Sequence, residues 1–116
     1  MALDVQKYRS LLLAERDEIT ALQTASADER APVELDQQSV GRLSRMDALQ
    51  QQSMALAEER RRGVRLKQIA AALARMDDDE FGYCVACGEE IVEKRLDLDP
   101  AAAVCTACAS AREANT

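Results

Sequence analysis

Several residue types are scarce in this sequence, and their scarcity limits the folds it can adopt. Histidine and tryptophan are absent, three residues are aromatic, and the 116 residues include only four glycines and two prolines. So few aromatic and turn-forming residues argue against a sheet or a thick globular core, whereas the abundant Ala, Leu, Gln, Glu and Arg favour long helices. The length fits one domain, or one compact knot with an extended appendage.

Further absences limit the partners and the activity. No apolar run approaches the roughly 18 residues of a membrane span, and no signal peptide opens the chain, so we expect a cytoplasmic protein without a membrane partner. The net charge of −6 disfavours direct DNA or RNA binding. No nucleophile–base pair, phosphate loop or open metal site is visible, which predicts that the protein is not an enzyme.

Two segments have the apolar spacing of coiled-coil helices. In the first, after the candidate N-cap Asp4, apolar residues recur at about 3.5 positions, with Glu15 at the missing step: Val5, Tyr8, Leu12, Ile19 and Leu22. The second runs from about Leu43 to Asp79, and its best stripe is Leu66, Ile69, Leu73 and Met76. The sequence therefore predicts a mainly α protein.

The two stripes fit a long antiparallel two-helix coiled coil. Facing residues in such a hairpin have position numbers with a constant sum, and three pairs share one sum: Val5–Met76, Tyr8–Leu73 and Leu12–Ile69. This register places the reversal at Val40–Gly41, where glycine suits a turn. We expect a hairpin over residues 1–79 with its tip near residues 36–47. Because the hairpin buries its own seam, it predicts a monomer.

Parts of the hairpin remain open to two interpretations. Pro32 is expected to kink the first arm, or else residues 26–34 form a loose loop between helices of unequal length. The seam is weak around "ALQQQSMALAEERRRG", so the arm needs an anchor at its wide end. The cluster "EERRRGVRLK" is either a solvated face with pairs such as Glu58–Arg62 or a contact for an acidic protein.

The four cysteines form the most specific pattern, CxxC–x17–CxxC. Two such knuckles can complete a tetrahedron around one structural Zn²⁺, and Gly88 lets the first knuckle turn. The ligands are Cys84, Cys87, Cys105 and Cys108. An iron S₄ site shares this geometry but normally comes with an aromatic-rich domain. A redox dithiol would need one CxxC beside a βαβ pattern, which is not visible.

The metal replaces a large apolar core in the predicted C-terminal domain, residues 80–116. Binding free energies of about 10 kcal/mol at such sites can serve as folding energy. We expect a few apolar side chains around the knot, a short two-stranded element near residues 91–96 and a short terminal helix; the side chains are Phe81, Tyr83, Ile91, Leu96, Leu98 and Val104. The preceding run "MDDDE" is neutralised in part by Lys94 and Arg95, or it faces a basic partner.

The stretch "DDDEFGYCVACGEEIVEKRLDLDPAAAVCTACAS" resembles the C-terminal zinc finger of the DksA/TraR family of bacterial transcription regulators. The resemblance rests on FGYCxxCGxxI, the Arg95–Leu96 step, Pro100 and the second CxxC at the same distance. It is strong from Glu80 to Cys108 and looser before Leu66. The chain looks like a short DksA-like protein that lacks part of the longer N-terminal region.

The resemblance implies a function. Members of the family bind RNA polymerase rather than DNA, insert the coiled-coil arm into the secondary channel, and use acidic tip residues to alter open promoter complexes. The tip motif Asp-x-x-Asp-x-Ala would fall on Gly41, Ser44 and Met46, so it is absent in strict form. We hypothesise that Asp47, assisted by Asp36, supplies the acidity, with Ser44 as a polar contact. Alternatively, both acids are caps or solvated residues.

Two further expectations concern partners. By the resemblance, the family's basic residues for the alarmone ppGpp correspond to Gln68, Asp99 and Ala109, none of them basic, which predicts weak or no ppGpp synergy. The alternative function is a zinc-dependent adaptor that contacts another protein.

Overall fold

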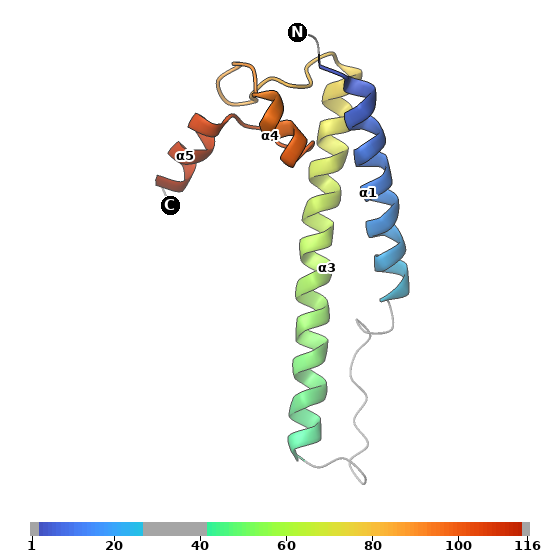
Figure 1. The fold of residues 1–116 in the computed structure, drawn as a ribbon. Coiled ribbons are helices and arrows are strands. Elements are labelled where there is room, and N and C mark those ends of the chain that lie inside the picture. Colours follow the sequence, from blue (N-terminus) through green and yellow to red (C-terminus); the bar gives the residue numbers. More distant parts are fainter. Residues whose placement is uncertain (1–2, 27–41, 115–116) are drawn as a thin grey trace. The chain divides into compact units, whose positions relative to one another are not determined.

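The computed structural model describes residues 3–26 and 42–114. Four helices are present in these ranges, α1 (Val5–Ala25), α3 (Arg42–Asp77), α4 (Glu93–Leu98) and α5 (Thr106–Ala114) (Figure 1). They contain no strand, only an isolated antiparallel bridge between Tyr83 and Glu90. The mainly α class, with a helical hairpin and a small four-cysteine finger, is confirmed. None of the described helices is long and apolar enough to cross a membrane.

The chain divides into two compact units, and both long helices continue from one into the other. Unit 1 contains Met1–Arg16 and Leu66–Thr116, and unit 2 contains Asp17–Arg65. Each unit contains contacts between α1 and α3: Arg9 contacts Asp77 in unit 1, and Gln23 contacts Arg62 in unit 2. Pro32, Asp36 and the predicted reversal at Val40–Gly41 lie outside the described residues.

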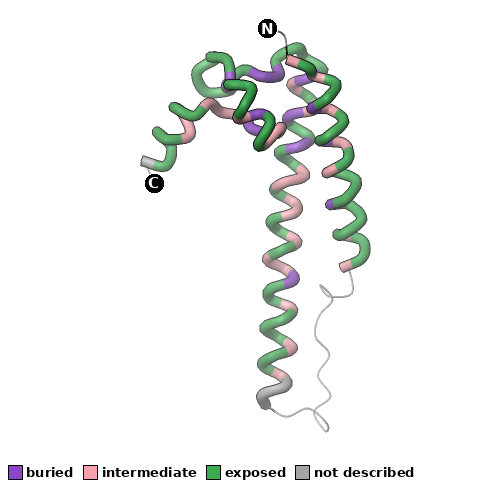
Figure 2. Tube along the Cα trace, viewed as in Figure 1, coloured by how far each residue is buried: buried purple, intermediate pink, exposed green. Residues whose placement is uncertain are grey.

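The core of unit 1 brings the ends of both long helices against the finger. Buried residues gather there (Figure 2), and the largest fully buried side chains are Tyr8, Leu12, Ile69 and Leu96. The rings of Tyr8 and Phe81 pack with centroids 5.7 Å apart. Met76 and Ile91 are also buried, so the predicted stripes and the finger share one apolar core.

Several details of the predicted packing are wrong. Leu22, expected in the seam, is 50 % exposed, and Leu98, expected around the metal knot, is 86 % exposed. Tyr83 is likewise exposed. The two-stranded element expected near residues 91–96 is instead the short helix α4, which begins after Val92. Leu98 is the last residue of α4, two positions after the buried Leu96, and two positions turn a side chain to the opposite face of a helix.

Polar contacts join α1 to the finger beside this core. The Tyr8 hydroxyl donates to Asp97 Oδ1 over 2.6 Å, and Lys7 Nζ lies 3.3 Å from the same oxygen. The hydrogen bond from Tyr8, helped by Lys7, lowers the pKa of Asp97, while burial and Asp97 raise the pKa of Tyr8 to about 12. A carboxyl with a lowered folded pKa stabilises the fold above its unfolded pKa, and this stabilisation is lost as the pH falls through the folded value.

The start of α1 and the end of α3 have identifiable capping signals. Asp4 caps α1 as predicted, because its Oδ1 accepts the Lys7 N–H over 3.1 Å. After the C-terminus of α3, Asp79 has a φ of +58° and Glu80 N donates to Arg75 O over 2.8 Å, as in a Schellman motif. Asp77 in the acidic run pairs with Arg9 over 3.2 Å, not with the expected Lys94 or Arg95.

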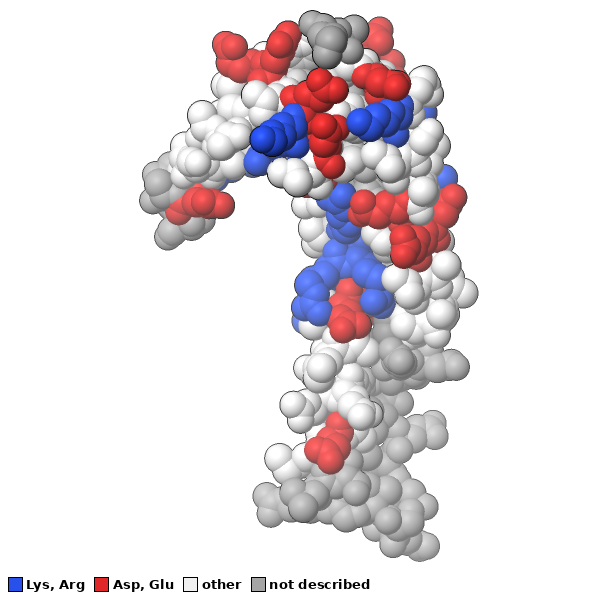
Figure 3. Space-filling view, in the orientation of Figure 1, with Lys and Arg blue, Asp and Glu red and all other residues white. Residues whose placement is uncertain are grey.

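The seam of unit 2 buries fewer apolar residues than that of unit 1, only Ile19 and Ala55 among the described residues, and adds polar contacts, which agrees with its weak apolar pattern. Arg62 Nε donates to Gln23 Oε1 over 2.6 Å and its Nη2 donates to Ser26 Oγ over 3.0 Å. The predicted Glu58–Arg62 pair is present at 3.7 Å. Arg62 is therefore an interhelical contact rather than a solvated residue. On the face shown in Figure 3, Lys and Arg gather over the middle of α3, whereas Asp and Glu predominate around the finger.

Replacing the buried leucine of α1 tests the core of unit 1. Leu12→Ala leaves a cavity where the side chain is fully buried, and we expect the free energy of unfolding to fall by about 2–5 kcal/mol. The neighbouring Leu11 is 49 % exposed and is the matched control, because Leu11→Ala should cost less than about 1 kcal/mol. Urea unfolding of the zinc-loaded protein measures both values. Equal losses in the two variants would contradict this core.

Candidate metal centre

The first cysteine pair lies in a turn that is held by its own backbone. Cys84 N donates to Glu89 O over 2.8 Å, and Gly88 N donates back to Cys84 O over 2.9 Å. Gly88 has a φ of +78°, a conformation that residues with a Cβ rarely adopt. The expected role of this glycine at the knuckle is therefore confirmed. The turn brings the sulfurs of Cys84 and Cys87 to the same side.

The second pair lies at the start of α5. Cys105 immediately precedes the helix, and its sulfur accepts the backbone N–H of Cys108 over 3.5 Å. Ala109 N donates to Cys105 O over 2.9 Å. The start of α5 thus orients the second pair.

One backbone hydrogen bond joins the two pairs directly. Val85 N, between the first two cysteines, donates to Ala103 O over 2.9 Å, two residues before Cys105. As a result the four sulfur atoms all lie within 4.8 Å of one another. The structure brings together every cysteine that the sequence predicts as a ligand.

The spacing of the sulfurs fits a tetrahedral zinc ion. Cys87 Sγ and Cys105 Sγ are 3.7 Å apart, and all four cysteines are free thiols. A disulfide would need about 2.05 Å. Four sulfurs at about 2.3 Å from one Zn²⁺ lie about 3.8 Å from each other, which agrees with the separation of Cys87 and Cys105. The residues present therefore fit a C4-type zinc site, and with four protein ligands its role is structural.

The pKa values of the thiols are also consistent with a bound cation. Backbone N–H groups, first that of Cys105, lower the pKa of Cys84 to about 6. Hydrogen bonding to the neighbouring thiols of Cys105, Cys84 and Cys87 raises the pKa of Cys108 to about 12. Without a metal the cluster therefore keeps protons on part of its sulfurs. A divalent cation displaces them, so metal binding releases protons and weakens in acid.

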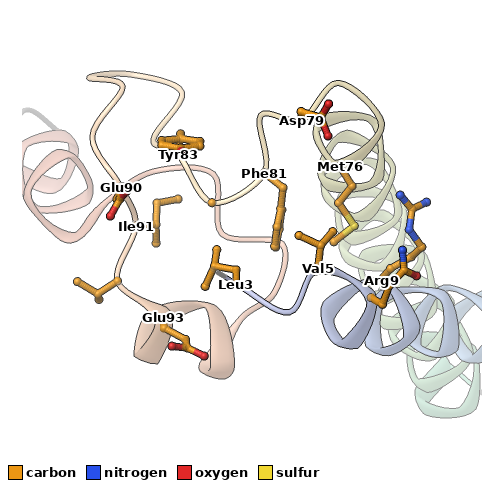
Figure 4. Close-up of a pocket in the computed structure, with 13 residues that line it drawn as sticks. Leu3, Val5, Arg9, Met76, Asp79, Phe81, Tyr83, Glu90, Ile91 and Glu93 are labelled. Carbon is orange, nitrogen blue, oxygen red and sulfur yellow. The ribbon is translucent and has the colours of Figure 1, made fainter. Parts of the chain in front are cut away.

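A cavity of unit 1 is separate from the sulfurs. It measures about 900 Å³ and lies between the first residues of the chain and the finger (Figure 4). Leu3, Phe81 and Ile91 contribute apolar walls, while Glu90 and Glu93 add carboxylates. Gly82 has a φ of +93°, which residues with a Cβ rarely adopt, and a Cβ there would lie 2.6 Å from Leu3 Cδ1, so the leucine side chain would have to move. No cysteine lines this cavity, and the metal centre is defined by the sulfurs alone.

The predicted tip residues are only partly described. Ser44 and Asp47 belong to the first turns of α3, and Asp47 is exposed. Asp36 lies outside the described residues, so a tip formed by all three stays a prediction. Sequence reasoning missed the contacts of Asp97 with Tyr8 and of Arg95 with Val104 O, because no spacing rule links α4 either to α1 or to the residues before Cys105.

Comparison with known proteins agrees with this site. Residues 79–114 match the family model described as the prokaryotic dksA/traR C4-type zinc finger. Over 61 residues, 53 % of this chain, the sequence is 41 % identical to the RNA polymerase-binding transcription factor DksA of Haemophilus influenzae, of which it covers 42 %. It is 36 % identical over 61 residues to the protein of the same name from Escherichia coli K12, of which it covers 40 %.

The fold has a close counterpart among solved structures. Transcription factor DksA2 from Pseudomonas aeruginosa superposes with a TM-score of 0.76 at 25 % identity, over 95 % of this chain and 83 % of that one. The chain thus aligns with most of a DksA2 chain, while its sequence match spans about two fifths of the curated relatives.

Removal of one ligand tests the metal centre. We expect the purified wild-type protein to contain one zinc ion per chain, and Cys87→Ser to lose most of it because three thiolates bind zinc far more weakly than four. The matched control is Val85→Ser, which introduces the same side chain at the exposed position between the two cysteines. Elemental analysis gives the stoichiometry. Full zinc occupancy in Cys87→Ser would contradict the ligand assignment.

Four cysteine sulfurs gathered around a zinc-sized space, the matching family model and the shared fold lead to one conclusion: residues 79–114 form a zinc finger of the dksA/traR C4 type.

Proposed function

We propose that this protein is a transcription regulator that acts by binding RNA polymerase. The observation that carries the proposal is the sequence match to relatives named RNA polymerase-binding transcription factors. The fold shared with transcription factor DksA2 over 95 % of the chain supports it. The protein works in the cytoplasm and has no catalytic activity of its own; its zinc ion maintains structure.

The proposed mechanism uses the helical pair as an arm. The arm enters the secondary channel of the polymerase, and residues at its tip alter the stability of the open promoter complex. Support comes from unit 1, where the shared apolar core and the Tyr8–Asp97 hydrogen bond fix the base of the arm, the start of α1 and the end of α3, to the finger. Zinc supplies the cross-link that keeps the finger folded. In this proposal the shape and charge of the chain's own residues determine how the arm contacts the polymerase.

The acidity of the tip is the active element in this proposal. Asp47 is an exposed carboxylate in the first turns of α3. A carboxylate held there can approach cations or basic loops near the polymerase active site. Asp36 and Ser44 are proposed to assist it. Apart from Asp47, few acids lie near the start of α3, which makes it the position where a change of charge has the clearest effect.

A charge-neutral substitution tests the tip. We expect Asp47→Asn to weaken the effect on open-complex lifetime in reconstituted transcription, because it removes the charge and keeps the shape. Its affinity for core polymerase should stay within about twofold of wild type, since most of an interface is energetically near neutral. The control is Glu18→Gln, which neutralises an exposed acid of α1.

The outcomes test polymerase binding and the tip assignment separately. If the wild-type protein does not bind core polymerase or compete with other secondary-channel proteins, the polymerase proposal is wrong and the adaptor alternative gains support. If it binds but Asp47→Asn behaves like wild type, only the tip assignment is wrong.

The response to ppGpp can be tested by adding charge. Gln68, Asp99 and Ala109 offer no cation, so we propose that ppGpp adds little to the wild-type effect. The variant with Gln68→Lys, Asp99→Arg and Ala109→Lys should gain synergy in the same transcription assay. A strong potentiation of the wild type by ppGpp would refute the proposal. A control variant with Ser110→Lys in place of Ala109→Lys tests whether the position matters.

A further inference from the structure

We propose that Arg95 is a positioning residue of the zinc site, which holds the peptide leading into Cys105 so that the second cysteine pair meets the metal in the right place. The inference concerns the finger alone and does not depend on polymerase binding.

Helix α4 gives Arg95 a fixed base. The next residue, Leu96, is fully buried in the core of unit 1. The residue after it, Asp97, accepts the Tyr8 hydroxyl over 2.6 Å. At the end of the helix, Asp99 N donates to Arg95 O over 2.9 Å. A six-residue helix would be unstable alone, but these contacts leave little freedom for the backbone of Arg95.

The side chain of Arg95 reaches the second knuckle. Its Nε donates to Val104 O over 2.9 Å, and Val104 is bonded directly to Cys105. The preceding carbonyl, that of Ala103, accepts Val85 N from the first knuckle over 2.9 Å. The two peptide groups before Cys105 are thus held from two sides, by the first cysteine pair and by α4. Only the contact from Arg95 depends on a side chain.

The two cysteine pairs differ in how much they support themselves. The first pair closes its own turn through Cys84, Glu89 and Gly88. The approach to the second pair has a turn at Asp99, whose Oδ1 accepts Ala101 N over 3.0 Å, but this turn ends before Val104. Arg95 supplies the support that the local backbone does not. Groups that orient metal ligands in this way typically contribute about 10- to 100-fold to metal affinity.

Hydrogen bonding and charge must be separated in the test. A zinc ion with four thiolates has a net charge of −2, so any nearby cation also favours it. Lys94 precedes Arg95 on α4, is exposed, and carries the same charge. It therefore provides a matched control for the loss of a positive charge at this end of the finger. Arg95→Lys keeps the charge and removes the Nε donor.

The experiment measures zinc transfer from the full-length, zinc-loaded protein to the chelator 4-(2-pyridylazo)resorcinol. We expect Arg95→Met to release zinc about tenfold faster than wild type, and Arg95→Lys to release it several-fold faster. Lys94→Met should stay within about twofold of wild type. Circular dichroism before chelation checks that each variant has the wild-type helix content.

Three results would overturn the proposal. They are a wild-type rate for Arg95→Met, an equal acceleration in Arg95→Met and Lys94→Met, and a wild-type rate for Arg95→Lys when Arg95→Met is faster. The last two would assign the effect to charge and not to position. If Arg95→Met does not load zinc at all, Arg95→Lys decides, because it retains the length and charge of the side chain.

Discussion

The clustering of four sulfurs is the constraint on which the finger depends. Thiolates this close repel one another, and the raised pKa of Cys108 shows how protons would otherwise relieve that repulsion. A divalent cation relieves it instead and ties together two chain segments separated by 17 residues. Between these segments only Ile91, Leu96, Ala101 and Ala102 are buried, which is little apolar area for a fold of this size. The metal therefore replaces a hydrophobic core that the sequence does not provide.

The finger in turn completes the base of the helical pair. Phe81 packs against Tyr8, and Leu96 is fully buried in the same unit as Leu12, so the core of unit 1 takes residues from both the hairpin and the finger. Asp97 then pairs with Tyr8 beside that core. The sequence motifs suggest a division between hairpin and finger at residue 79. Unit 1 instead contains the start of α1 and the end of α3 together with the finger. In energetic terms the hairpin base and the zinc site form one structure.

The sequence was sufficient for elements with a strong periodicity or a fixed spacing. The heptad pattern located Tyr8, Leu12, Ile69 and Met76, and the CxxC spacing located the metal site. Composition could not place Leu98, because its exposure depends on where α4 starts within a segment that also suits a strand. Nor could it foresee that Arg62, assigned to a solvated face or a partner contact, makes hydrogen bonds to α1. These failures concern tertiary contacts, for which single-sequence patterns hold little information.

The polar seam at Arg62 has a consequence for how the arm moves. In unit 1 the two helices are joined by fully buried large apolar side chains. In unit 2 only Ile19 and Ala55 are buried among the described residues, and Arg62 adds hydrogen bonds to Gln23 and Ser26. Water can replace such bonds at little cost. Backbone amides of α3 should therefore exchange with solvent faster before Arg65 than after Leu66, although they belong to one continuous helix. Opening of the arm can then begin away from the zinc and leave the finger folded.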